Sequence, residues 1–174
     1  MRAKIEWPVF EVRRRELDIR DANGRAMRRL SLEFPADFMA FKANDELAFV
    51  ASTGLVEFGV WGKFCKLCVD LKSGEVVSLL ARPGRKQLSP EFVNSSLRKF
   101  TQVSERLIER FPYYGKSAEI EDCEAVAAEL SKGIRKIDPS AIEPDFFWAN
   151  IVDDISFGNF QTESFQKPEA GTEG

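Results

Sequence analysis

The pattern of apolar and polar positions changes character close to residue 94. Before that point, short runs with alternating or β-branched apolar residues are separated by turn sequences that contain glycine. Such runs indicate strands with one buried face. After it, apolar residues recur at spacings of three and four, as on one face of a helix. This order predicts an α+β domain in which C-terminal helices cover an antiparallel sheet.

The first half of the chain predicts two hairpins. Residues 16–20 and 30–34 alternate in hydrophobicity around an Asp-Ala-Asn-Gly turn at residues 21–24. Residues 72–75 form a second turn, for which we expect Leu71 to lie opposite Val76 and Val69 opposite Ser78. The expected strands that surround this turn and precede it lie at residues 47–52, 56–61, 64–71 and 76–78.

Residues 35–41 predict one or two turns of helix between these strands. Pro35 suits the first turn of a helix, and the spacing of Phe38 and Phe41 places both on one side.

Three longer helices are expected after residue 94. Asn94, Ser95 and Ser96 offer side chains that can cap a helix, and a cap at Asn94 would contribute about 1 kcal/mol. The first helix runs for about 14 residues to Pro112. The second carries an apolar stripe from residue 123 to residue 137, and the third has Pro144 in its first turn and Gly158 at its C-terminal cap.

Chain length and charge refine this picture. A chain of 174 residues fits one domain, which we place at residues 1–161, with residues 1–30 as an N-terminal extension and residues 162–174 as a disordered tail. The first 30 residues hold nine basic residues and five carboxylates, whereas the chain from residue 117 holds four basic residues and thirteen carboxylates. The acidic end is suited to steering a basic partner.

The chain contains no histidine, which excludes a Ser-His-Asp triad, a Cys-His dyad and a His-ligated zinc. Its three cysteines favour a reducing compartment, and we expect the protein in the cytoplasm. No run of 18 or more apolar residues is present, so we expect no membrane partner.

Two groups of residues resemble reactive motifs. Cys65 and Cys68 have the spacing of a redox pair, but alternation along a strand sends their sulfur atoms to opposite faces, so buried thiols are favoured. The carboxylates at residues 119–122 and 153–154 are suited to acid/base work or cation binding, but solvated faces and helix caps are favoured. We therefore expect no catalytic residue, metal or cofactor.

Arginines near the N-terminus raise the question of nucleic-acid binding. They cluster at residues 13–15 and 28–29. Acidic neighbours dilute this charge, and the sequence pI is near 5.3. We expect no nucleic-acid partner.

Two segments carry a family resemblance. Residues 66–77 contain Cys-Val-Asp in a strand followed by a Ser-Gly turn, and residues 92–100 contain Val-Asn-Ser-Ser-Leu before a long helix. Together with Pro-Ala-Asp-Phe at residues 35–38, they resemble the fourth group of the SUKH superfamily of bacterial immunity proteins, over roughly residues 30 to 160. The resemblance implies an α+β fold and noncatalytic binding of a cognate protein toxin, often a nuclease or nucleic-acid deaminase.

For the partner-binding surface we choose aromatic and acidic residues near the start of the second helix, together with an aromatic residue beside two glycines. They are Trp61, Tyr114, Glu119, Glu121 and Asp122. An interaction adaptor without a toxin is the alternative function, and an enzyme that uses cysteines or carboxylates is a third. The oligomeric state stays open.

Overall fold

The computed structural model describes residues 9–51, 53–80, 89–115 and 117–160. In these residues the chain forms two antiparallel sheets and three α-helices, which confirms the α+β class. The two-stranded sheet, called the ribbon below, consists of β1 (Val12–Arg20) and β2 (Ala26–Pro35). The five-stranded sheet follows sequence order: β3 (Phe41–Val50), β4 (Leu55–Trp61), β5 (Cys65–Asp70), β6 (Val76–Leu80) and β7 (Pro90–Asn94).

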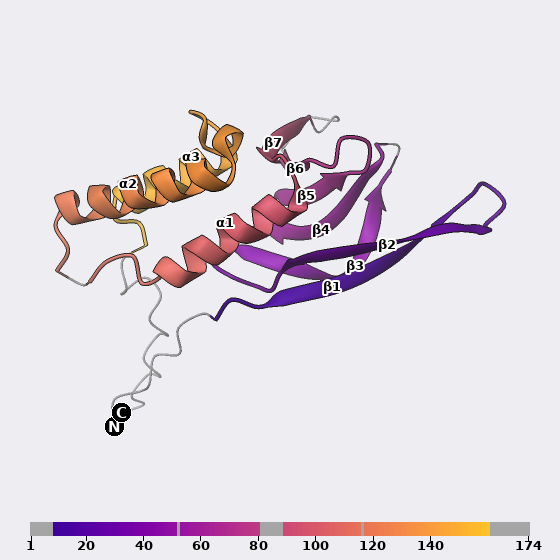
Figure 1. Ribbon diagram of the computed structural model, residues 1–174, viewed down its shortest axis with the longest axis horizontal. Helices are drawn as coiled ribbons and strands as arrows, with labels where there is room; N and C mark the ends of the chain where they lie inside the picture. Colours follow the sequence, from indigo (N-terminus) through magenta and orange to yellow (C-terminus); the bar gives the residue numbers. More distant parts are fainter. Residues whose placement is uncertain (1–8, 52, 81–88, 116, 161–174) are drawn as a thin grey trace, which may run out of the picture.

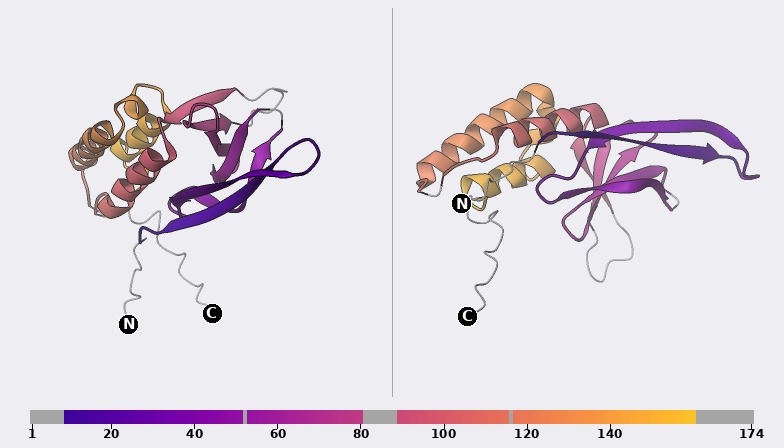
Figure 2. Two further views of the ribbon diagram at one scale, coloured as in Figure 1. Left: turned by 45° about the vertical axis from the view of Figure 1, so that its right-hand side comes forward. Right: turned by 90° about the horizontal axis from the view of Figure 1, so that it is seen from below.

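The helices lie at one end of the molecule. They are α1 (Leu97–Arg110), α2 (Ile120–Ile137) and α3 (Phe147–Ser156), with the 3-10 helix η1 (Pro139–Ile142) between the last two. Helix α1 lies between the sheet and the pair formed by α2 and α3, and the ribbon projects beyond the sheet at the other end (Figures 1 and 2). Helix α1 packs directly on the sheet, and η1 and α3 also contact it at β7.

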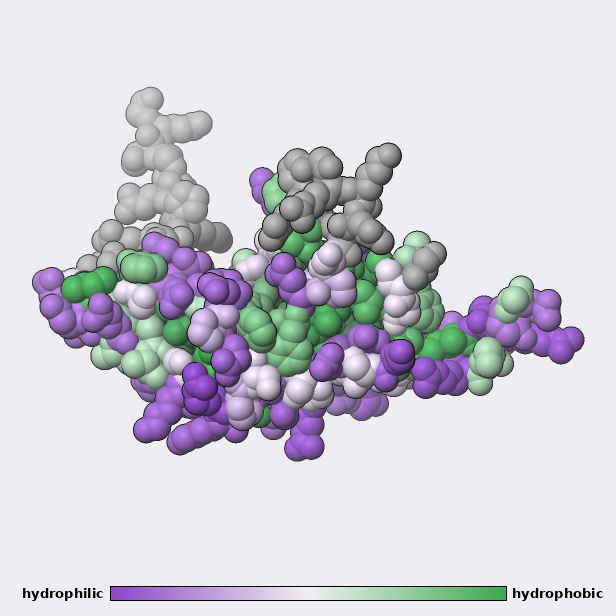
Figure 3. Space-filling view, turned by 90° about the horizontal axis from the view of Figure 1, so that it is seen from above, coloured by the Kyte–Doolittle hydropathy of each residue, from purple (hydrophilic) through white to green (hydrophobic). Residues whose placement is uncertain are grey.

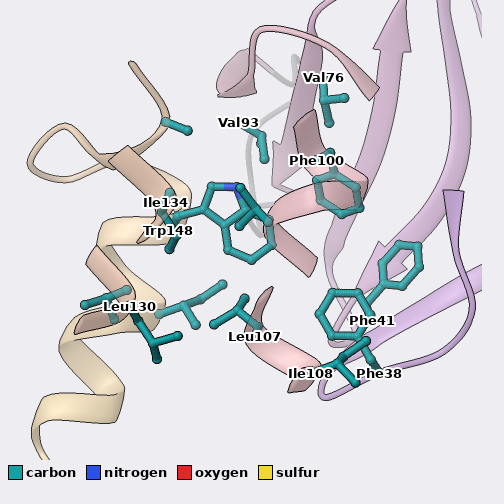
Figure 4. Close-up of a cluster of buried hydrophobic side chains, with 14 of the residues drawn as sticks. Phe38, Phe41, Val76, Val93, Phe100, Leu107, Ile108, Leu130, Ile134 and Trp148 are labelled. Atoms are coloured by element: carbon teal, nitrogen blue, oxygen red, sulfur yellow. The ribbon is translucent and has the colours of Figure 1, made fainter. Parts of the chain in front are cut away.

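Aromatic side chains fill the core between the sheet and the helices. Phe100 of α1 is fully buried, with ring centroids 5.4 Å from Phe58 of β4 and 5.5 Å from Trp148 of α3. Leu107, Leu130 and Ile134 continue this layer between α1 and α2 (Figure 4). Since a buried aromatic side chain removes roughly 150–250 Å² from water, these contacts dominate the packing of the helices on the sheet.

The helices agree closely with the sequence pattern. Helix α1 has the expected length of 14 residues, and α2 ends at Ile137 with Asp138 as its C-cap residue, as expected. Gly158 follows α3 with φ of 76° and donates its N–H to the Ile155 carbonyl, as a C-terminal glycine does. Pro144 lies in the turn before α3, not in its first turn, which corrects that prediction.

The hairpin predicted around the turn at residues 21–24 is also confirmed and forms the ribbon. The register predicted for β5 and β6, in contrast, is wrong by two residues. Val69 lies opposite Val76, and Leu67 lies opposite Ser78. The turn starts earlier than expected because Asp70 accepts the Lys72 N–H through its side chain and pairs by its backbone N–H with Glu75. This register places two buried valines opposite each other on the core face.

The helix predicted at residues 35–41 is absent from the described structure. Pro35 ends β2, and Phe38 and Phe41 exchange backbone hydrogen bonds of 3.1 and 2.8 Å across a tight turn in which Met39 has φ of 48°. The turn sends both phenylalanine rings into the core, with centroids 5.4 Å apart. Burial of both rings explains why the turn replaces a helix whose only support is local propensity.

Strand β7 was not expected from the sequence. It is short, begins at Pro90 and lies at the edge of the sheet, paired with β6. Proline is tolerated at the first residue of an edge strand because it removes no ladder hydrogen bond there. Proline is otherwise rare in strands, so the sequence signal for this short strand is weak.

Candidate interaction surfaces

A buried polar network explains the Asn-Ser-Ser motif before α1. Asp138, 1% exposed, accepts hydrogen bonds from Asn94 Nδ2 at 2.9 Å and from the Ser95 N–H at 2.8 Å. Asn94 in turn accepts a 2.7 Å hydrogen bond from Trp148 Nε1. The network joins the start of α1 to the end of α2 and to α3, so this part of the motif serves folding, with no reactive group exposed.

The helix cap is Ser96, not Asn94, which corrects the prediction. The Ser96 hydroxyl accepts the Lys99 N–H at 3.2 Å, as a cap residue does. Asn94 precedes this position, and its side chain is committed to Asp138 and Trp148.

The same contacts determine the pKa of the Asp138 carboxyl group. Burial by itself raises the pKa of this carboxyl, but hydrogen bonds from Asn94 and Ser95 and the charge of Lys99, whose Nζ lies 3.5 Å away, outweigh it. The pKa of Asp138 is therefore held below its usual value, and the group is an anion at neutral pH.

The two aromatic residues chosen from the sequence are used largely for packing. Trp61 is half-buried at the end of β4, with ring centroids 5.1 Å from Phe147 and 5.7 Å from Phe38. Tyr114 is only 7% exposed, and its hydroxyl accepts the Phe160 N–H at 2.8 Å. Their positions leave little side-chain surface for a partner.

The three acidic residues lie together at the start of α2. Glu119 is the N-cap residue, and its N–H donates to Asp122 Oδ2 at 3.0 Å. Glu121 is exposed beside them. Negative charge in the first turn also stabilises the helix through its dipole, so these residues have a structural role in addition to any contact role.

The two cysteines of the reactive-looking spacing are poor nucleophiles. Cys68 is fully buried among Leu55, Val77 and Leu79, and burial raises its pKa to about 12. Leu67, its neighbour in β5, belongs to the main core, so alternation along the strand is as expected. Burial also raises the pKa of Cys65. Because a thiolate is the reactive form, neither thiol is activated at neutral pH.

Two features of the described part of the chain bear on ligand binding. These residues contain no group of three or more Cys, Asp or Glu side chains placed to hold a metal ion. An open groove of about 530 Å³ lies between β2 and α1 and is lined by Glu33, Arg98 and Thr101, among others. Glu33 is ion-paired with Arg14, so it is not available as a free base in this groove.

The ribbon forms a charged surface that was not predicted from the sequence. Its outer face carries a ladder of ion pairs in which Arg29 binds Asp18 at 2.9 Å and Glu16 at 3.3 Å. Beyond this ladder, the ribbon turn projects from the body with several arginines (Figure 1). The sequence signal for this surface was the density of arginines at residues 13–29. We considered these arginines only as a nucleic-acid site, and that interpretation gave no reason to select the turn.

The family model of SUKH-4 immunity protein matches residues 31–154, which is well over half of the chain. The chain belongs to the SUKH-4 immunity protein family. The matched part of this SUKH-4 protein contains the five-stranded sheet, α1, α2 and most of α3, whereas β1 and the ribbon turn precede it. Comparisons with curated proteins and with solved structures gave no match.

Family membership indicates an immunity function and implies a toxin as the cognate partner. In the part of the SUKH-4 protein that the structure describes, none of the helices is both long and apolar enough to span a membrane.

Proposed function

We propose that this SUKH-4 protein neutralises a cognate protein toxin of the nuclease or nucleic-acid deaminase class by tight binding in the cytoplasm, without catalysis. The family match over residues 31–154 carries this proposal, because it includes nearly the whole sheet and helix body. Two chemical features support it. The chain has no histidine, and the pKa values of Cys65 and Cys68 are raised above those of reactive thiols.

The start of α2 is the contact region that we propose within the matched body. Glu119, Glu121 and Asp122 are exposed there, and their charge suits a basic toxin surface. Tyr114 and Trp61 act mainly by positioning: Tyr114 anchors the segment before α2 to Phe160, and Trp61 packs against α3. A protein inhibitor needs about 800 Å² of surface on each partner, so neighbouring exposed residues of α2 belong to the same region.

Survival in a co-expression assay tests the function. Toxin domains encoded beside this chain are expressed with and without it, and the complex is then recovered by size exclusion. We expect rescue of growth and co-elution of the two proteins. Absence of rescue with every neighbouring toxin, or turnover of a small substrate by the purified chain, would contradict the proposal.

A further inference from the structure

The turn of the ribbon is separate from the part of the chain that defines the family. We call residues 18–29 the arm tip; they end just before the family match begins at residue 31. The base of the ribbon is anchored because Leu32 and Phe34 are buried in the main core. The arm tip extends past the sheet, at the opposite end from the start of α2 (Figures 1 and 2).

The arm tip is held in one shape by its own hydrogen bonds. Asp21 Oδ1 accepts the N–H groups of Asn23 and Arg25, each at 2.9 Å. Gly24 has φ of 76°, and its carbonyl accepts a 2.9 Å hydrogen bond from Arg20 Nη1. Because the turn is already ordered, a partner that binds it loses less free energy to conformational ordering.

The charge of the arm tip is only partly neutralised within the protein. Asp18 binds Arg29 and Arg20, and Asp21 is used in the turn. In contrast, the side chains of Arg25 and Arg28 form no ion pair or hydrogen bond with any described residue. The arm tip thus presents two guanidinium groups without a partner among the described residues, on a projecting, largely hydrophilic element (Figure 3).

An exposed apolar side chain lies between these two arginines in the sequence. Met27 is 69% exposed and lies at the register shift of the ribbon, between the Ile19–Arg28 and Arg20–Ala26 pairs. The arm tip therefore combines arginines with an exposed apolar side chain. A projecting element fits a cleft better than a flat surface, and methionine adapts readily to an apolar pocket.

We infer that the arm tip is a second contact region for the toxin, which inserts into an acidic cleft with Met27 in an apolar pocket. This inference rests on the proposed function. A protein cleft is favoured over nucleic acid because the chain is acidic, with a net charge of −3, and because phosphates offer no pocket for Met27.

Binding kinetics with the toxin domain encoded beside this chain test the inference. R25E/R28E should slow association about tenfold at low ionic strength, since like charges then face each other at the cleft. M27S should speed dissociation about tenfold, as expected for loss of an apolar anchor. K63E/K72E is the matched control: it reverses two exposed charges in turns of the five-stranded sheet, outside both proposed contact regions, and should change both rates less than about twofold.

The outcomes separate the two proposals. If the wild-type chain binds and protects while R25E/R28E and M27S behave like it, the arm tip is not a contact region and the proposed function stands. If the wild-type chain neither binds nor protects, the proposed function fails, and the recognition of acidic protein surfaces is then decided by a measurement that needs no toxin.

That measurement is a titration followed by NMR of the Met27 methyl group in the full chain. A poly-L-glutamate peptide at low ionic strength should shift this signal in the wild type but not in R25E/R28E, while the Met39 methyl signal stays constant. The absence of a Met27 shift would overturn the inference. Binding of a short DNA duplex about tenfold more tightly than poly-L-glutamate would overturn it in favour of nucleic acid, and loss of the Met27 signal by self-association would overturn it in favour of a second copy of the chain.

Discussion

The ribbon and the helical end of this protein hold their polar and charged groups in place in different ways. In the ribbon, Arg29 and Asp18 pair across adjacent strands at the surface. At the helical end, Asp138 binds Asn94, a residue 44 positions away, in a fully buried site. Local surface pairs can change without disturbing the fold, whereas the buried network ties three elements together. Substitution of the surface pairs in the ribbon is therefore expected to disturb the fold less than substitution of Asp138.

The largest expected effect is on stability, and it differs between a residue of the core and a residue of the ribbon. F100A removes a fully buried ring and should lower the free energy of unfolding by about 3–5 kcal/mol. L30A removes a half-buried side chain at the ribbon base and should cost about 1–2 kcal/mol. Urea denaturation followed by far-UV circular dichroism measures both values, and equal losses would show that the ribbon is as integral to the fold as α1.

Loss of the buried carboxylate should have the next largest effect. D138A leaves the Asn94 amide and the Ser95 N–H without their acceptor, so we expect a loss of about 2–3 kcal/mol at pH 7. D153A, at an exposed position of α3, is the control and should change stability by less than about 0.5 kcal/mol. A similar, small loss in both variants would contradict a stabilising role for the network.

The stability difference between the wild type and D138A should depend on pH, and the pKa of Asp138 gives the sign of this dependence. The pKa of Asp138 is lower in the folded protein, so the unfolded chain takes up a proton first as the pH falls. The stability that Asp138 contributes is thus present above the usual carboxyl pKa of about 3.9 and decreases as the pH falls below it. The stability difference between wild type and D138A should narrow between neutral pH and strongly acidic pH, and a widening difference would reverse this assignment.

Charge reversal at the start of α2 should have an intermediate effect, on association. E119K/E121K/D122K should slow association with the toxin about tenfold and weaken its salt dependence, since these residues attract a basic surface. The control E46K/E109K/D153K makes the same change in net charge at scattered exposed positions. If the two triple variants associate equally fast, the start of α2 is not the contact region.

The smallest effect is expected within the ribbon ladder. R29A removes surface ion pairs to Asp18 and Glu16 and should leave the global denaturation midpoint unchanged, because exposed pairs contribute little. Amide hydrogen exchange near the arm tip should rise severalfold, since local opening becomes easier. A clear fall in the midpoint would instead make the ribbon part of the cooperative core.

Signals within a few neighbouring residues accounted for the parts of the fold that the sequence predicted. The period of apolar residues located α1 and α2, and the turn at residues 21–24 located the first hairpin. For the contact surface, the sequence supplied the acidic residues of α2, which the structure places together at the helix start. It did not reveal that Tyr114 is buried, because its contact with Phe160 spans 46 positions.

The sequence by itself determined the α+β class, the helices and the family, since the helical period, the turn residues and the family motifs can each be recognised within a short segment of the chain. Tertiary structure decided the tight turn at Phe38 and Phe41, the register of β5 and β6, and the role of Asn94. Each depends on a partner that local sequence does not specify: a core that buries two rings, a facing strand, or a carboxylate 44 positions away. The free energy of these contacts comes from burial and pairing between distant segments, and it outweighs local preference.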